Sequence, residues 1–148
     1  MHNSKCDLKD FPRGTKPLAK NDKGEWVDPI TGKKARIMPF PEGERINFVE
    51  GTARPLMLQP GTKIYRVTDR ADGGGGYWTF EKPRSKEQWR NDYAVLEEWG
   101  VEGKYLSSYT VKDGDNIGAW VGGAAKQIGD ETGEVRLGGK DQLLLDSD

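Results

Sequence analysis

Proline is concentrated at one end of this chain, and this distribution constrains the fold more than any other feature. Seven of the eight prolines fall within the first 60 of the 148 residues. Because proline lacks a backbone N–H and fixes φ, we expect this spacing to forbid long helices and central strands. We therefore expect residues 1–60 to form an irregular leader, packed in part on a later core, and residues 61–148 to form the main domain. A disordered tail is the alternative for this leader, above all for residues 1–20.

Short segments of alternating polarity follow the leader. Residues 62–68 place Ile64 and Arg66 on one face and Tyr65 and Val67 on the other, which is typical of a half-buried strand. A run of four glycines, 73–76, then forms either a phosphate-binding loop or a surface hairpin loop, although it matches neither nucleotide-binding fingerprint. We predict further strands over 77–80, 105–111, 117–121, 134–137 and 142–145, with the last two paired, and a small-residue turn over 122–125.

One amphipathic helix is predicted over residues 86–99. Ser85, with Gln88 three residues later, forms a capping box, and Gly100 is a suitable left-handed stop. The aromatic and apolar residues between them recur at helical spacing and would form one buried stripe. They are Trp89, Tyr93, Leu96 and Trp99. Together, the predicted strands and this helix indicate an α+β domain, with a curved, mainly antiparallel sheet and one principal helix.

Charge and side-chain inventory exclude several kinds of chemistry. Twenty-three basic against 24 acidic residues give a net charge of -1, which argues against nucleic acid as the main ligand. No apolar run of about 18 residues predicts a membrane span, and the first residues do not resemble a classical signal peptide. With Cys6 and His2 as the single cysteine and histidine, we expect neither a metal site nor a histidine general base.

Two polar residues stand where a ligand contact is plausible on chemical grounds. Arg66 lies mid-strand between apolar neighbours, where a guanidinium suits the capture of a phosphate. The alternative is an edge-strand arginine that faces water. Gln142 heads an apolar strand directly after a Gly138-Gly139 turn, so its side chain leaves the sheet where the loop ends.

The aromatic segment and the helix add further candidates. Trp78 and Phe80 alternate with Tyr77 and Thr79, so an aromatic wall next to hydroxyls could stack on a planar ring; core packing is the alternative. Arg90 lies beside the apolar stripe of the helix. It can reach into a groove between helix and sheet, or pair with carboxylates on the surface.

Taken in order, these pieces resemble the NAD-glycohydrolase toxins of the tuberculosis-necrotizing-toxin type. That family shares a degenerate version of the ADP-ribosyltransferase toxin fold. The resemblance covers roughly residues 59–146, and the order of short motifs carries it. They are 58–62, Arg66, Thr79 with Phe80, 105–111, Trp120 with the glycines after it, Gly138 with Gly139, and Gln142.

The resemblance implies NAD or NADP as the substrate, cleavage of the nicotinamide–ribose bond, and no prosthetic group. Arg66 would match the arginine that grips the diphosphate, Arg90 the second phosphate-binding arginine, and Gln142 the late-strand glutamine. Arg66 and Gln142 are then expected to converge on one crevice. Family members also use a histidine near the site, and this chain departs from that pattern because its single histidine is His2.

Three functions follow as alternatives. The first is an NAD(P)+ glycohydrolase toxin, exported to act in the cytoplasm of a target cell and silenced in its producer by a cognate immunity protein. Residues 61–148 would be its NAD-binding catalytic domain, with Asp141 or Asp115 supplying negative charge near the developing cation. The second transfers ADP-ribose to a protein or RNA instead of water. The third is a non-enzymatic binding module whose aromatics form its core or a partner surface.

Overall fold

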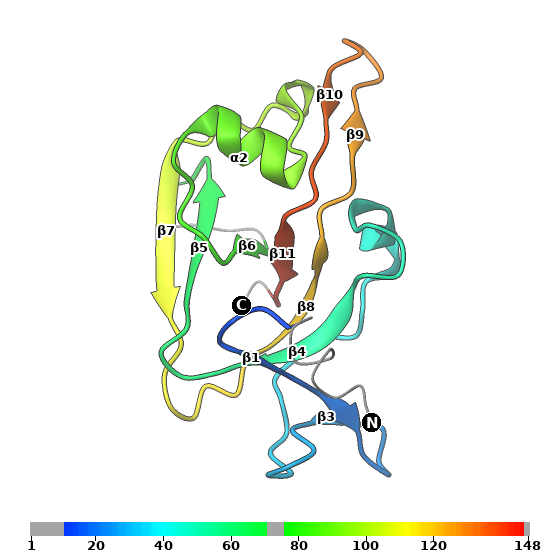
Figure 1. Cartoon of the computed structure of the whole chain (residues 1–148), viewed down its shortest axis with the longest axis vertical. Helices are drawn as coiled ribbons and strands as arrows, with labels where there is room; N and C mark the ends of the chain where they lie inside the picture. Colours follow the sequence, from blue (N-terminus) through cyan, green and yellow to red (C-terminus); the bar gives the residue numbers. More distant parts are fainter. Residues whose placement is uncertain (1–10, 71–75, 147–148) are drawn as a thin grey trace, which may run out of the picture.

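The computed structural model describes residues 11–70 and 76–146, and in them a curled antiparallel sheet carries few helices (Figure 1). Seven strands form the sheet in the order β1-β4-β8-β11-β6-β5-β7. Their bounds are β1 Thr15–Pro17, β4 Arg54–Leu58, β5 Lys63–Thr68, β6 Tyr77–Thr79, β7 Tyr105–Thr110, β8 Gly118–Gly123 and β11 Asp141–Leu144. The fold is α+β, as the sequence predicts. His2, Cys6 and Gly73–75 lie outside the described residues.

The remaining elements are short and lie around this sheet. Two separate hairpins pair β2 (Ala19–Lys20) with β3 (Trp26–Val27), and β9 (Gln127–Ile128) with β10 (Val135–Arg136). The helical elements are η1 Glu42–Asn47, α2 Lys86–Tyr93 and η2 Glu97–Trp99. Among the described residues, no helix is long and apolar enough to cross a membrane.

The main core lies on one face of the sheet, and alternating residues of the central strands build it. Ala119, Val121 and Leu143 are completely buried there. Leu56, Leu58, Ile64, Val111 and Leu145 complete this cluster. Because strand residues alternate between faces, the residues between them point to the other side, where α2 and Phe48, the residue after η1, pack.

The leader contributes more regular structure than its prolines suggest. β4 contains Pro55 and still pairs with β1 on one side and β8 on the other, so the expectation that the leader lacks central strands is wrong. The Pro55 carbonyl accepts a bond from the Leu18 N–H, which lies just past β1, at 3.3 Å. The Pro55 nitrogen faces that same edge, so its missing N–H removes no bond from the β4–β8 ladder. The division at residue 60 stays a prediction, but the sheet extends across it.

Two predictions about the later strands are wrong. Gly122 and Gly123 lie inside β8, paired with Gln142 and Asp141, and do not form a turn. A side chain at Gly122 would approach the Thr52 hydroxyl and the Ala53 nitrogen to within 3 Å, so glycine here permits close packing. The two last strands also do not pair with each other: β10 pairs with β9, and β11 lies between β8 and β6.

The helix begins as predicted but ends early. Ser85 caps it by accepting a bond from the Gln88 N–H at 3.1 Å. α2 ends at Tyr93, because Ala94 adopts a left-handed conformation with φ 53°, and Val95 N–H bonds back to the Arg90 carbonyl. This is a Schellman-type end with alanine where glycine is usual. The prediction of one helix through residue 99 is therefore wrong, and the single turn of η2 follows separately.

A buried carboxylate fixes the turn that follows β3. Asp28 is 2% exposed, accepts a bond from the Ile30 N–H at 2.9 Å, and pairs with the Lys16 ammonium at 2.5 Å. The bond from Lys16 is the main reason that the pKa of Asp28 falls from 3.8 to about 2. This pair ties the β2–β3 region to β1.

Asp28→Asn should lower the free energy of unfolding at pH 7 by roughly 2 kcal/mol, since it removes the charge from a buried, charge-assisted bond. The folded pKa lies below the unfolded one, so the stabilisation is complete above about pH 4 and disappears as the pH falls toward about 2. Urea unfolding of both proteins at several pH values measures this. The difference should shrink in acid, and a difference that stays constant down to pH 2 would contradict the assignment.

Candidate functional site

A cavity of about 140 Å³ lies between α2, η1 and the face of the sheet opposite the main core. We call it the aromatic cavity because five aromatic residues line it: Tyr77, Trp78, Trp89, Tyr93 and Trp99. Three side-chain amides also line it, those of Asn47, Gln127 and Gln142. A lining of apolar and aromatic side chains with a few placed polar groups is typical of ligand-binding sites.

Gln142 forms the floor of the aromatic cavity. In β11 it is paired with Thr79 of β6 and Gly122 of β8, and opposed residues in an antiparallel ladder point to the same face. The side chain is 6% exposed, and its Nε2 donates to the Asn47 carbonyl at 2.8 Å. That bond engages the amide nitrogen and fixes the orientation of the group.

Asn47 connects the polar groups of the cavity. Its side-chain amide donates to Glu44 at 2.8 Å, and its side-chain oxygen accepts from Gln127 at 3.4 Å. The Tyr77 hydroxyl donates to the same Glu44 carboxylate at 2.5 Å. Sequence reasoning missed both Glu44 and Asn47. They come from the leader, and nothing in their spacing indicates that they meet residue 142.

The phenols of the cavity remain protonated in neutral solution. Burial, and to a smaller extent the neighbouring Glu44, raises the pKa of Tyr77. Burial is also the largest cause that raises the pKa of Tyr93 to about 12. Both hydroxyls are therefore neutral hydrogen-bonding groups.

Arg66 does not share this cavity with Gln142. Thr79, which opposes Gln142, also opposes Tyr65 of β5, so Tyr65 and Gln142 point to the same face. Arg66 is the next residue along β5 and points to the opposite face. The expectation of a single crevice for Arg66 and Gln142 is therefore wrong.

Arg66 instead lines a second depression on the opposite face, which we call the arginine groove. Arg36 and Tyr109 line it as well. The Arg66 guanidinium carbon lies 4.3 Å from the centre of the Trp78 ring, and Trp78 borders both this groove and the aromatic cavity. Asp115 accepts a bond from the Tyr109 hydroxyl at 2.5 Å, so it belongs to this side of the molecule.

The other predicted residues lie in the cavity wall, against the core and behind the end of α2. Thr79 lines the aromatic cavity, whereas Phe80 packs against the main core. Arg90 is 7% exposed and donates to the carbonyls of Val95 and Val101. Neither alternative weighed for Arg90 is correct, because its guanidinium holds the chain after α2 and does not extend into a groove or pair on the surface.

A third depression adjoins the aromatic cavity, and Tyr93 lines both. We call it the cationic groove because Arg13, Lys63 and Lys140 line it. Glu81 and Asp141 also line it, and the Lys140 ammonium contacts Glu81 at 3.1 Å. The two hollows together offer a ring-sized cavity next to a region lined by cationic side chains.

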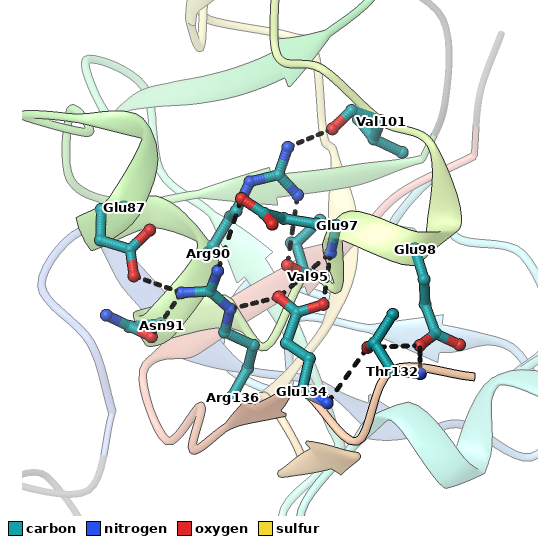
Figure 2. Close-up of polar contacts among 10 residues, drawn as sticks. All are labelled: Glu87, Arg90, Asn91, Val95, Glu97, Glu98, Val101, Thr132, Glu134 and Arg136. Carbon is teal, nitrogen blue, oxygen red and sulfur yellow. Dashed lines mark hydrogen bonds and ion pairs between the residues drawn. The ribbon is translucent and has the colours of Figure 1, made fainter. Parts of the chain in front are cut away.

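A buried arginine holds one wall of the aromatic cavity in place (Figure 2). Arg136 of β10 bonds to Glu87 of α2 at 2.5 Å, to Asn91 at 2.9 Å and to Glu134 at 2.6 Å. Glu134 in turn accepts from the Glu97 N–H at 2.9 Å. Figure 2 shows these groups converging from the hairpin, α2 and η2. The cluster therefore fixes η2 and the hairpin, the elements that carry Trp99 and Gln127.

Comparison with known proteins gives one structural likeness. No family model matches the chain, and no curated protein matches it. A solved structure titled "Structure of Tse6 in complex with Tsi6" is 20% identical, with a TM-score of 0.47 over 80% of this chain and 77% of that one. Within the described residues, no group of three or more His, Cys, Asp or Glu could hold a metal ion. The fold and the site thus define an α+β protein whose curled sheet carries an aromatic cavity with an amide floor.

Proposed function

We propose that the protein is an NAD(P)+ glycohydrolase that binds the nicotinamide ring in the aromatic cavity. The observation that carries the proposal is Gln142, a fixed amide on the floor of an aromatic cavity about the size of one ring. The resemblance described under Sequence analysis also implies a role for this glutamine in NAD cleavage. An ADP-ribosyltransferase-like fold is part of this proposal.

The proposed reaction needs little acid or base catalysis. The bond between the ribose C1′ and the pyridinium nitrogen breaks, its electron pair passes to that nitrogen, and nicotinamide leaves as a neutral molecule. Water then attacks C1′ and loses a proton, which yields ADP-ribose. The transition state resembles an oxocarbenium ion, as in glycoside hydrolysis. Gln142 would orient the ribose and the attacking water, a contribution that depends on positioning.

The diphosphate would lie in the cationic groove, which Tyr93 joins to the aromatic cavity. Lys140 and Lys63 would contact it there, with Arg13 at the rim. This replaces the role first given to Arg66, which faces the other side of the sheet. The proposal gives Arg90 no part in phosphate binding, because its guanidinium is buried and donates to two backbone carbonyls.

The biological setting proposed with this activity is that of an exported toxin. Depletion of NAD would harm the cell that makes the enzyme, so a cognate immunity protein that covers the cavity is part of the proposal. The site of action would be the cytoplasm of the target cell.

Release of nicotinamide from NAD and NADP by the purified protein tests the activity, with free ADP-ribose as the second product. A labelled protein or RNA in place of free ADP-ribose would indicate a transferase, and no turnover of either dinucleotide would contradict the proposal.

Lys140→Met and Arg66→Met form a matched pair that tests the path of the diphosphate, since each removes one positive charge. Lys140→Met should raise KM for NAD roughly fivefold to tenfold, because an ammonium–phosphate contact is lost. Arg66→Met should change KM and kcat by less than about twofold. Steady-state kinetics of both variants decide this. If Arg66→Met, and not Lys140→Met, raises KM, the diphosphate lies in the arginine groove.

A further inference from the structure

Glu44 places a carboxylate directly behind the wall of the aromatic cavity. It is half-buried in η1, and its contacts are the Tyr77 hydroxyl at 2.5 Å and the Asn47 side-chain amide at 2.8 Å. Both of these donors line the cavity. Glu42, on the same helical turn, forms an ion pair with the neighbouring Arg45 at 2.8 Å. The contacts of Glu44 are therefore with neutral groups.

The charge of Glu44 acts on the cavity with little compensation. Tyr77 stays an uncharged O–H donor because burial raises its pKa. None of the described residues that line the cavity is a lysine or arginine. In a poorly hydrated site, a carboxylate is weakly screened, and the faces of the Tyr and Trp rings add negative potential. The aromatic cavity and the Glu44 carboxylate together therefore favour the binding of a flat cation.

We propose that Glu44 makes the aromatic cavity selective for a planar organic cation, and so determines the preference for an oxidised pyridinium ring over a neutral ring. The choice of nicotinamide as that ring rests on the proposed function. The preference for a cation rests on the cavity alone. Glu44 acts through Tyr77 and Asn47, and it is a positioning and specificity residue that does not itself touch the ring.

The timing of charge in the reaction predicts which kinetic constant Glu44 affects. The ring is positive before the bond breaks and neutral afterwards, while the positive charge moves to the ribose. A carboxylate beside the ring therefore favours the bound substrate more than the transition state, so it lowers KM without raising kcat. A carboxylate beside the ribose would instead raise kcat.

Binding of two small probes tests the proposal without any turnover. 1-Methylnicotinamide is a cation and nicotinamide is its neutral counterpart, and calorimetry measures the affinity of both. The wild-type protein should bind the cation about tenfold more tightly, and Glu44→Gln should abolish this preference while leaving the neutral ring unaffected. Glu44→Asp should restore part of it. Glu42→Gln is the matched control, because it removes the same charge from the exposed side of η1 and should keep the preference.

Kinetics with NAD provide the second measurement. Glu44→Gln should raise KM about tenfold with kcat unchanged or slightly higher. Equal affinity of the wild-type protein for both probes would overturn the proposal, as would a preference that survives in Glu44→Gln or is also lost in Glu42→Gln. A fall in kcat at constant KM would likewise overturn it. If NAD is not cleaved but the cation preference is present, the glycohydrolase fails and the cation site stands.

Discussion

Gln142→Leu should lower the rate of nicotinamide release at least about a hundredfold, because it removes the fixed amide on the floor of the aromatic cavity. Leucine has a similar volume, so the packing of β11 against β6 and β8 should persist. The Asn47 carbonyl that accepts from Gln142 also accepts from the Ala125 N–H at 2.9 Å, and the substitution does not leave it unpaired. The melting temperature should therefore change little while activity falls.

The matched control is Gln127→Leu, which removes another amide from the same cavity. Gln127 bonds to the Asn47 side chain at 3.4 Å and lies on the hairpin wall, away from the floor. We expect this variant to lose less than about fivefold in kcat/KM. Chromatographic detection of nicotinamide, with thermal unfolding alongside, measures both variants. Full activity of a folded Gln142→Leu protein would contradict the proposed catalytic role of the glutamine.

Arg90→Leu should reduce stability by about 3 kcal/mol, the second large effect expected. The guanidinium is buried and donates to the carbonyls of Val95 and Val101, and bonds from a charged donor contribute about 1.5–3 kcal/mol each. For a chain of this length, such a loss lowers the melting temperature by roughly 6–12 °C. Differential scanning calorimetry provides the measurement.

Arg84→Leu is the comparison for this variant. Arg84 is exposed immediately before α2, so its loss should change stability by no more than about 0.5 kcal/mol. If Arg90→Leu melts like the wild-type protein but raises KM for NAD, Arg90 binds phosphate after all, and its assignment as the anchor of the segment after α2 is incorrect.

Local patterns predicted those parts of the fold that local physics determines. Period-two alternation over residues 62–68 corresponds to β5, and the capping box at Ser85 marks the start of α2. The end of α2 was not predicted, because Ala94 adopts a left-handed conformation that is unusual for alanine. The pairing of β11 was not predicted either, since its partner strands lie at residues 77–79 and 120–123, distant in the sequence.

The candidate site was predicted only in part, because it too depends on how distant strands pair. Alternation correctly separates Arg66 from Tyr65, but it cannot say which of the two faces Gln142. That depends on the register of Tyr65 with Thr79 and of Thr79 with Gln142, and a shift by one residue reverses every side chain. No sequence pattern singled out Glu44 or Asn47, because polar side chains in a proline-rich segment are usually solvated.

The bond between Gln142 and the Asn47 carbonyl joins positions 95 residues apart, and this separation affects when the aromatic cavity can form during folding. A nascent polypeptide emerging from the ribosome has no cavity floor until β11 has inserted between β6 and β8. The same holds for any chain threaded in extended form through a narrow conduit. The cavity floor, and any binding that depends on it, therefore forms only once the two distant segments have met.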